Sequence, residues 1–280
     1  MASVGPRALY AKTRLGVIHA VRAGTGRPIL LLHQTPRSVD EYRDVLPLLA
    51  RDFAVIAKDT PGFGASPALA GATPSIEAWA SAGLALLDAL AIQEAAVVGH
   101  HTGAAVALEI AAQAPQRVRA LVLSACPFVD AERRARHATH RVIDDVEPRA
   151  DGAHLAELWN RRRPFYPEGD MDLLARFMTD ALRAGPMAAE GHRVVNRYRM
   201  EERVGLVAAP TLVLAPTEDP HAYPAASHVA AAIRGSVLVE ARGAMVPFPD
   251  QLPHVFATLV RDFVMVQTSR RSDEYGRAGG

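Results

Sequence analysis

The chain has 280 residues, 49% of them hydrophobic and 22% charged, which is enough to bury one large core in one main domain. Its formal net charge of +1 and its single cysteine exclude a strongly basic nucleic-acid footprint and an internal disulfide framework. The first residues lack the apolar core of a secretory signal, and no apolar run reaches the ~20 residues that span a bilayer. We therefore expect a cytoplasmic protein that binds neither nucleic acid nor membranes.

Short apolar runs alternate with helix-length segments along most of the chain. The expected strands are residues 16–22, 28–32, 53–57, 95–98, 118–124, 210–215 and 236–240. The expected helices are residues 40–51, 75–91, 102–114, 223–233 and 251–266. This alternation predicts an α/β protein, in which helices cover both faces of a mostly parallel sheet.

The alternation breaks once, between residues 129 and 205, where the sequence is helical and contains no convincing strand. We predict an inserted helical cap at 129–205, a core formed by 1–128 and 206–266, and a disordered polar tail at 267–280. The cap carries aromatic and methionine side chains, which favour an apolar or aromatic small molecule as the ligand. They include Trp159, Phe165, Tyr166, Phe177, Met178, Tyr198 and Met200. An arginine of the cap that binds a carboxylate is a further possibility.

The most informative segment is Gly99-His100-His101-Thr102-Gly103, which lies between the run of residues 95–98 and a helix of small residues. It matches the G-x-S-x-G motif except at the centre, where His101 replaces serine. In that motif the central residue occupies a strained turn from a strand to a helix. We expect His101 to project into a pocket from the helix N-terminus, which disfavours positive charge and keeps the imidazole largely neutral.

These segments resemble the α/β-hydrolase family over about residues 8–266. Residues 30–36 (LLLHQTP) resemble the strand and oxyanion loop of the family, and residues 59–66 (DTPGFGAS) resemble the turn after the next strand. Residues 210–220 resemble the loop that carries the catalytic acid, and residues 243–247 (GAMVP) resemble the loop that carries the catalytic histidine. The resemblance implies an α/β-hydrolase fold with an eight-stranded, mostly parallel sheet, an inserted helical cap and no cofactor.

The resemblance also assigns roles to single residues. Asp219 falls at the catalytic acid, whereas Ala244 falls where the family has its catalytic histidine. The backbone N–H groups of Gln34 and Thr102 fall at the oxyanion hole. His33 is grouped with these substrate-binding residues, although its ring, like that of His100, is expected to be buried for structural reasons. The catalytic pair that we expect is His101 with Asp219, in contact directly or through water.

A base beside an oxyanion hole, without a hydroxyl nucleophile, suits water activation or proton abstraction next to a carbonyl. The favoured function is hydrolysis of a small ester, lactone or activated carbonyl compound, with His101 as the base or as a covalent nucleophile. A cofactor-independent lyase, decarboxylase or isomerase acting on a carbonyl substrate is one alternative, and a non-catalytic ligand-binding protein is another.

Other candidate residues have simpler interpretations. Cys126 is expected to be a small buried side chain. The sequence leaves open whether His221 supplies a second catalytic imidazole and whether the protein forms a homodimer. No spaced set of metal ligands occurs, since adjacent histidines at a turn point to different sides, so no metal site is predicted.

Overall fold

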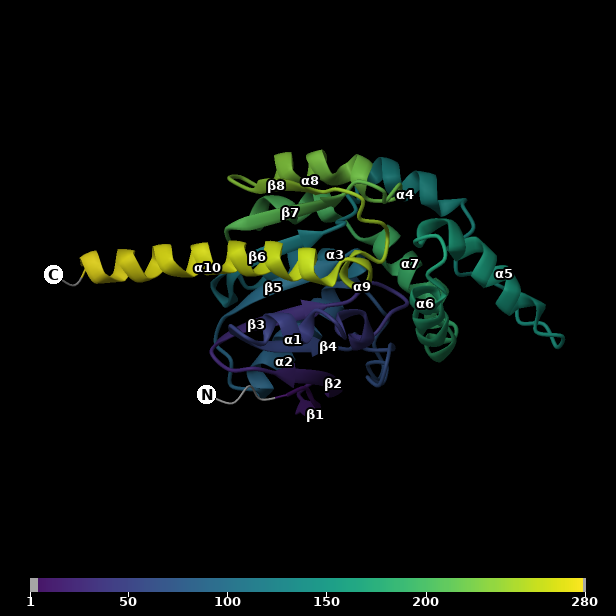
Figure 1. Cartoon of the computed structure of the whole chain (residues 1–280), viewed down its shortest axis with the longest axis horizontal. Coiled ribbons are helices and arrows are strands. Elements are labelled where there is room, and N and C mark those ends of the chain that lie inside the picture. Colours follow the sequence, from purple (N-terminus) through teal and green to yellow (C-terminus); the bar gives the residue numbers. More distant parts are fainter. Residues whose placement is uncertain (1–4, 279–280) are drawn as a thin grey trace.

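The computed structural model describes residues 5–278, with the backbone alone for residues 268–278. Its strands form one sheet in the order β1-β2-β4-β3-β5-β6-β7-β8 (Figure 1). They are β1 (Arg7–Thr13), β2 (Gly16–Ala23), β3 (Arg27–Leu32), β4 (Phe53–Lys58), β5 (Ala95–His100), β6 (Val118–Ser124), β7 (Thr211–Pro216) and β8 (Val237–Ala241). Strands β1, β2 and β4 pair antiparallel, and the other neighbours pair parallel. The predicted eight-stranded, mostly parallel sheet is confirmed.

Strand β1 is the one that the apolar runs did not reveal. Its sequence RALYAKT mixes polar and apolar residues, and Ala11 alone among its side chains is fully buried. It forms a hairpin with β2, pairing from Arg7 with Arg22 to Thr13 with Gly16. Because it lies at the edge of the sheet, most of its side chains contact solvent and the strand needs no hydrophobic run.

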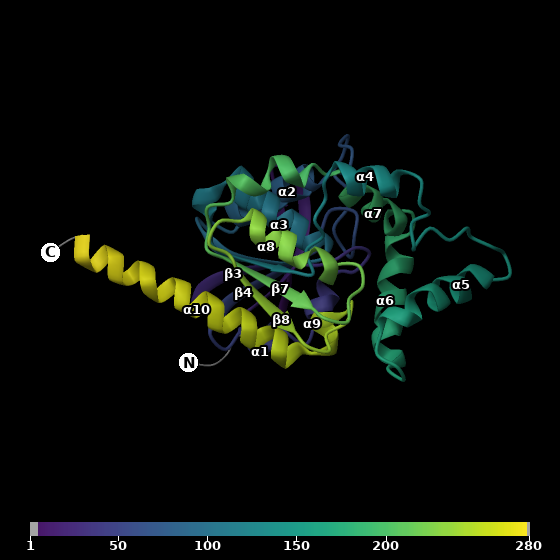
Figure 2. The ribbon, with the colours of Figure 1, turned by 90° about the horizontal axis from the view of Figure 1, so that it is seen from above.

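Helices cover the two faces of the sheet (Figure 2). Helices α2 (Ile76–Ala89), α3 (Thr102–Gln113) and α8 (Ala226–Ala232) bury one apolar cluster, and α1 (Leu46–Leu49), α9 (Phe248–Gln251) and α10 (Pro253–Ala278) bury another. The helix predicted at 40–51 is instead a 3₁₀ turn, Val39–Tyr42, followed by α1. Pro47 explains the division, because it has no N–H to continue an earlier helix and suits the first turn of a new one.

The C-terminal segment differs from its expectation. Helix α10 continues to Ala278, whereas the sequence predicts disorder from residue 267. No proline interrupts residues 254–278, so the helix that begins at Pro253 can propagate one hydrogen bond at a time. The last two residues of the predicted tail, 279 and 280, lie outside the described residues.

The predicted cap segment, residues 129–205, contains α4 (Ala131–Ala138), α5 (Ala153–Arg162), α6 (Met171–Ala184) and α7 (Met187–Arg197), and its described residues form no strand. Asp130 and Asp170 begin α4 and α6 by accepting hydrogen bonds from backbone N–H groups of the first turn, at 2.8 and 3.1 Å. Figure 1 shows α4 and α7 next to the strand ends and α5 extending outward. This segment therefore lies over the edge of the sheet where β5 ends and α3 begins.

Candidate functional site

The turn between β5 and α3 is a sharp elbow with His101 at its apex. The residue has φ +47° and ψ −113°, a conformation that is costly for a side-chain-bearing residue. A Cβ on Gly99 would lie 2.0 Å from the Gly103 carbonyl oxygen, and one on Gly103 would lie 1.9 Å from the Leu32 carbonyl oxygen. Only glycine fits at both positions, and this close approach of β5, α3 and β3 holds the elbow in place.

The elbow brings His101 against Asp219, in the loop after β7. His101 Nε2 and Asp219 Oδ2 are 2.7 Å apart, and the carboxylate is fully buried. The ring N–H is not aligned with the oxygen, and neither atom has another hydrogen bond among the described residues. The expected contact between these two residues is therefore present.

The other carboxylate oxygen of Asp219 is held by the backbone. Oδ1 accepts the N–H groups of His221 and Ala222, at 2.9 and 3.1 Å. Burial favours the neutral acid, but the His101 imidazole and these N–H groups outweigh it and lower the pKa of Asp219 to about 2. The carboxylate is thus ionised at neutral pH and oriented toward the imidazole.

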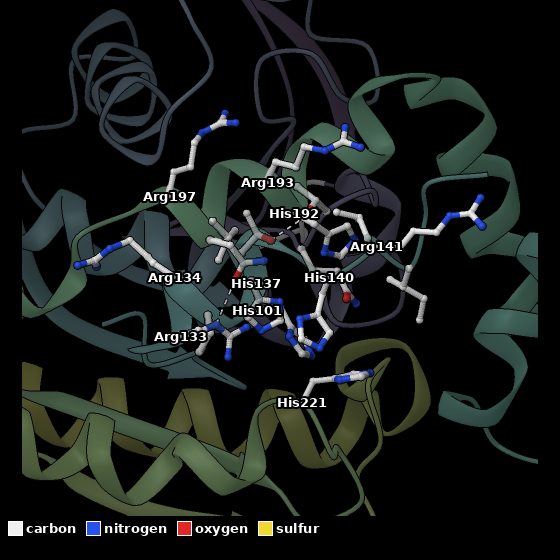
Figure 3. A pocket seen from close by; sticks show the side chains of 18 of the residues that line it. His101, Arg133, Arg134, His137, His140, Arg141, His192, Arg193, Arg197 and His221 are labelled. Atoms are coloured by element: carbon white, nitrogen blue, oxygen red, sulfur yellow. Dashed lines mark hydrogen bonds between the residues drawn. The ribbon is translucent and has the colours of Figure 1, made fainter. Parts of the chain in front are cut away.

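This arrangement decides which nitrogen of His101 can act on a ligand. With Nε2 against the carboxylate, the favoured tautomer has the proton on Nε2 and a lone pair on Nδ1. The side chain is 16% exposed and lines a cavity, where Figure 3 shows it near the centre. The available nitrogen is therefore Nδ1, as a base or a nucleophile.

Two neighbouring histidines serve the fold. His33 Nδ1–H donates to the Gln34 carbonyl oxygen at 2.7 Å, and its Nε2 accepts the Thr60 N–H at 2.9 Å. His100 Nε2–H donates to the Val246 carbonyl oxygen at 2.8 Å, and burial lowers the pKa of His100 to about 3. Both rings are buried, as expected. The grouping of His33 with the substrate-binding residues stays a prediction that the contacts do not support, because both of its nitrogens are engaged and it does not line the cavity.

The N–H groups expected to form an oxyanion hole are arranged differently from the prediction. The Gln34 backbone N–H donates to Glu41 Oε2 at 2.9 Å, and its side-chain amide donates to Oε1 at 2.6 Å. This N–H is therefore not free to bind a substrate oxygen, although Gln34 does line the cavity. The Thr102 N–H, at the first position of α3, and the Thr35 N–H have no partner among the described residues. Their hydroxyl groups are 2.8 Å apart, and both residues line the cavity.

Burial raises the pKa of Glu41 to about 8. Since the pKa is near 4.5 in the unfolded chain, Glu41 contributes stability that is full below pH 4.5 and is lost as the pH rises through about 8. We expect Glu41→Gln to flatten this decline, measured as the free energy of unfolding in urea between pH 4.5 and 8.5. The exposed Glu168→Gln should keep the wild-type slope. An unchanged slope in Glu41→Gln would contradict the assignment.

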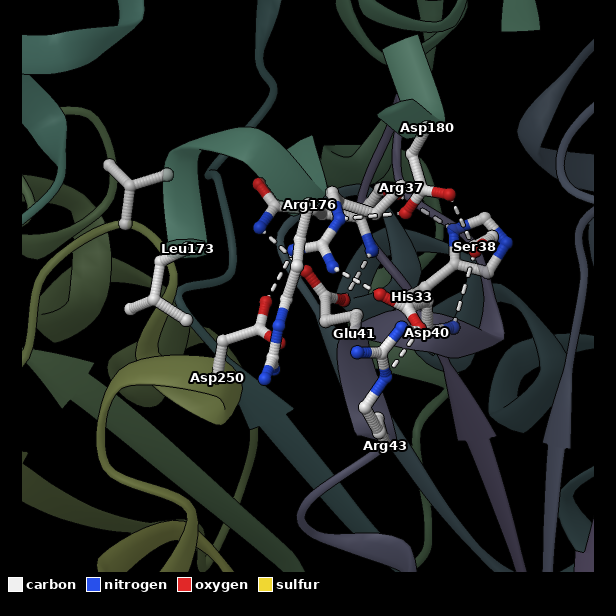
Figure 4. Close-up of polar contacts among 12 residues, drawn as sticks. His33, Arg37, Ser38, Asp40, Glu41, Arg43, Leu173, Arg176, Asp180 and Asp250 are labelled. Atoms are coloured by element: carbon white, nitrogen blue, oxygen red, sulfur yellow. Dashed lines mark hydrogen bonds and ion pairs between the residues drawn. The ribbon is translucent and has the colours of Figure 1, made fainter. Parts of the chain in front are cut away.

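A buried ionic cluster beside Glu41 joins the core to the predicted cap (Figure 4). Arg37, fully buried in the loop after β3, donates from Nε to Asp180 Oδ2 of α6 at 2.8 Å and from Nη1 to Asp250 of α9. Ser38 Oγ also donates to Asp180, at 2.8 Å. One guanidinium thus connects the oxyanion loop with two helices from distant parts of the sequence.

Removing one carboxylate from this cluster leaves the buried Arg37 charge less compensated. We expect Asp180→Ala to lower the free energy of unfolding by ~3 kcal/mol. The control is Asp172→Ala, which removes an exposed carboxylate from the first turn of the same helix and should cost less than ~1 kcal/mol. Urea denaturation measures both, and equal losses would show that the cluster does not hold the helix.

The loop after β8 places its residues differently from the sequence alignment. Ala244, aligned with the family's catalytic histidine, is fully buried in the apolar cluster that contains Phe248 and Phe256. Val246 is the residue of this loop that lines the cavity with His101. The Ala244 equivalence stays a prediction, but the side chain in the position to face the elbow is that of Val246.

Two further candidate residues, His221 and Cys126, have different surroundings. His221 lines the cavity and packs its ring 4.5 Å from that of Phe165, and burial lowers the pKa of His221 to about 4. Cys126 is buried as expected, and burial raises the pKa of its thiol to about 12.

Among residues 5–278, no three His, Cys, Asp or Glu side chains are grouped to hold a metal ion. In the same range, no helix has the length and apolar character to cross a membrane.

The cavity above His101 has a volume of about 660 Å³ and a strongly basic lining. It includes five histidines and seven arginines but no Asp or Glu side chain; these are His101, His137, His140, His192, His221, Arg133, Arg134, Arg141, Arg162, Arg193, Arg197 and Arg199. None of the aromatic or methionine side chains named for the cap lines it; Tyr166, Phe177 and Met178 instead form a separate apolar cluster. The lining also includes the apolar side chains of Pro127, Val142, Ile143, Val195 and Val246, so it combines basic and apolar groups and contains no aromatic ring other than those of the histidines.

Comparison with known proteins agrees with this fold. The 2-hydroxymuconate semialdehyde hydrolase of Pseudomonas sp. strain CF600 is 38% identical over 104 residues, 36% of this chain and 37% of that protein. Haloalkane dehalogenase 2 of Mycobacterium tuberculosis is 34% identical over 128 residues, 46% of this chain and 45% of that protein. The chain thus spans less than half of the length of these curated relatives.

Among solved structures, the enol-lactonase of Burkholderia xenovorans LB400 superposes with a TM-score of 0.76 at 20% identity, covering 92% of this chain and all of that one. This likeness concerns the fold. The family model described as alpha/beta hydrolase fold matches residues 27–226, a range that includes the elbow, the oxyanion loop and Asp219. On this match, together with the sheet order and the elbow, the chain belongs to the alpha/beta hydrolase fold family.

Proposed function

We propose that the chain is an enzyme that hydrolyses a small ester, lactone or activated carbonyl compound, with His101 as general base and Asp219 as the group that orients it. The observation that carries the proposal is the 2.7 Å contact between His101 Nε2 and Asp219 Oδ2 beside a cavity of about 660 Å³. It gives the imidazole the carboxylate partner that a catalytic histidine requires.

The proposed reaction needs no hydroxyl nucleophile. His101 Nδ1 takes a proton from a water molecule, whose oxygen then attacks the carbonyl carbon. The resulting tetrahedral intermediate collapses as the bond to the alcohol oxygen breaks, and the imidazolium returns its proton to that oxygen. The products are an acid and an alcohol, or one hydroxy acid from a lactone. Asp219 stabilises the imidazolium that forms between the two proton transfers.

The developing oxyanion needs donors, and we assign them to the backbone N–H groups of Thr102 and Thr35. Both residues line the cavity, and neither N–H has a partner among the described residues. Thr35 takes the role expected of Gln34, whose N–H is bound to Glu41. Each donor is worth ~3 kcal/mol of transition-state stabilisation.

The names of the relatives support hydrolysis over the alternatives. The curated relatives are a semialdehyde hydrolase and a dehalogenase, and the structural neighbour is an enol-lactonase. A lyase, decarboxylase or isomerase would use the same base but no water molecule as a reactant. A binding protein would need neither the base nor the water. Covalent attack by His101 Nδ1 on the carbonyl carbon is a variant of the same hydrolysis.

Product analysis in isotopically heavy water tests the proposal. A panel of p-nitrophenyl esters and small lactones is incubated with the protein in H₂¹⁸O, and the products are examined by mass spectrometry. Hydrolysis predicts one heavy oxygen in each acid product. Turnover without heavy oxygen would identify a lyase, decarboxylase or isomerase, and a ligand that is bound and recovered unchanged would identify a binding protein.

A further inference from the structure

The arginines that line the cavity are not equivalent. Six of the seven have a carboxylate within ion-pair distance, and all six of these carboxylates belong to the predicted cap. The pairs are Arg134 with Glu201, Arg141 with Glu157, Arg162 with Asp144, Arg193 with Asp145, Arg197 with Glu190, and Arg199 with Glu202. These arginines are compensated within the protein and need no ligand.

Arg133 is the exception. It is half-buried on α4, and its Nε donates to the neutral Asn196 Oδ1 of α7 at 3.2 Å. Among the described residues, no carboxylate lies within ion-pair distance of its guanidinium, and Nη1 and Nη2 have no hydrogen-bond partner. Figure 3 shows Arg133 near the centre of the cavity, whereas Arg134, Arg141, Arg193 and Arg197 extend toward its edges.

The surroundings of Arg133 add further positive charge. Arg136 lies on the same helix, and no Asp or Glu side chain lines the cavity. Burial disfavours the charged guanidinium and repulsion from Arg136 adds to this, so the pKa of Arg133 is lowered, although Cys126 and Asp130, which begins α4, act in the opposite direction. A half-buried cation without an anionic partner is costly. An anion in the cavity would remove that cost.

We propose that Arg133, positioned by Asn196, binds a carboxylate of the substrate, so that the substrate is a small carbonyl compound with a carboxylate apart from the reacting carbonyl. This inference rests on the proposed function, because it places the reacting carbonyl at His101 in the same cavity. With Nε engaged by Asn196, the two Nη groups remain as a planar fork, which matches two carboxylate oxygens. A cavity of about 660 Å³ is of the size that holds a small molecule.

The test compares two esters that differ in one charged group. p-Nitrophenyl hemiglutarate carries a terminal carboxylate, and p-nitrophenyl pentanoate has the same chain length without it. We expect the wild type to prefer the hemiglutarate by about 10- to 100-fold in kcat/KM. Arg133→Met should remove that preference by lowering kcat/KM for the hemiglutarate to the value for the pentanoate in the same variant.

A matched control variant separates a specific contact from general charge. Arg136→Met removes a positive charge from the same helix, but its side chain is exposed, pairs with Glu132 and does not line the cavity. It should keep the preference for the hemiglutarate. A preference that survives in Arg133→Met, or that is lost equally in both variants, would overturn the proposal. So would a wild type that does not favour the anionic ester.

Direct binding keeps this inference distinct from the proposed function. Calorimetry with glutarate, and with the neutral glutaramide as control, should show glutarate binding that is at least 10-fold weaker in Arg133→Met and unchanged in Arg136→Met. If neither ester is turned over but this pattern holds, the hydrolase proposal fails and the carboxylate site stands. If the neutral ester is hydrolysed but glutarate does not bind, the hydrolase proposal stands and the carboxylate site is refuted.

A second substitution guards against a folding defect in Arg133→Met. Arg133→Lys keeps the charge but not the planar fork, so it should retain an intermediate affinity for glutarate, between those of the wild type and Arg133→Met. Circular dichroism and thermal unfolding show which variants are folded. A folded Arg133→Lys with full wild-type affinity and ester preference would refute the bidentate contact.

Discussion

Replacing His101 with alanine is expected to lower kcat/KM for a hydrolysable ester by about 10² to 10⁴-fold. The substitution removes the ring nitrogen that takes the proton from water, while the elbow, the cavity and the N–H groups of Thr35 and Thr102 remain. Alanine has the same difficulty as histidine at φ +47°, so the strained turn is not relieved. Steady-state kinetics with the preferred ester of the panel measures the effect.

Two further variants test the partner of the base and provide a control. Asp219→Asn keeps the shape of the carboxylate but not its charge, and it should lower kcat/KM by at least about 10²-fold because the imidazolium loses its partner. His254→Ala removes an exposed histidine on α10 that does not line the cavity and should leave turnover unchanged. If His101→Ala were as active as His254→Ala, the elbow histidine would not be the base.

The second large effect is a gain of activity by a different route. The double substitution His101→Ser with Val246→His is expected to restore esterase activity by at least about 10²-fold over His101→Ser alone. Serine at the elbow supplies a hydroxyl nucleophile, and a histidine at position 246 faces the same cavity within the loop beside Asp219. A serine needs such a base to be an effective nucleophile.

The matched control is His101→Ser with Ala244→His. Ala244 is fully buried in the apolar cluster that contains Phe248 and Phe256, so a histidine there should fail to rescue activity and should destabilise the fold through overpacking by ~1–3 kcal/mol. Burst kinetics would reveal an acyl-enzyme in the active double variant. If a histidine at position 244 restored activity and one at 246 did not, the base would have to reach the elbow from the position that the sequence alignment indicates, and not from the residue that lines the cavity.

The sequence was sufficient to predict the parts of the site that follow from local motifs. His101 directly follows the apolar strand β5 and Asp219 lies three residues after the end of β7, and parallel strands bring their carboxyl ends to one edge of a sheet. Glycines on both sides of the elbow indicated the close approach of β5 and α3. These are short-range patterns, and the contact between His101 and Asp219 follows from them together with the sheet order.

The structure adds to the sequence where the outcome depends on residues that are distant or have no periodic spacing. The Gln34 N–H donates to Glu41, and nothing in the sequence indicates where the Glu41 carboxylate points. The loop after β8 has no regular period, so the sequence does not show that Val246, and not Ala244, lines the cavity. Both differences concern the direction of a group and not its place in the chain.

The character of the cavity was missed for a related reason. The predicted cap is rich in arginines, but the sequence does not show which of them are paired with a carboxylate. In the structure six arginines of the lining are indeed paired, but Arg133 is not, and the pairing depends on how α4, α5, α6 and α7 pack. The aromatic side chains that suggested an apolar ligand stabilise those helices against one another instead.

A crystal structure of the protein with a ketone analogue of the hemiglutarate ester tests the central claim most directly. In this analogue a methylene group replaces the ester oxygen, so the ligand binds without being cleaved. The account predicts a water molecule within hydrogen-bond distance of His101 Nδ1 and next to the carbonyl carbon, with Nε2 against Asp219. A carbonyl group bound away from His101, or a His101 ring with Nδ1 turned toward Asp219 and no water or ligand at its other nitrogen, would contradict it.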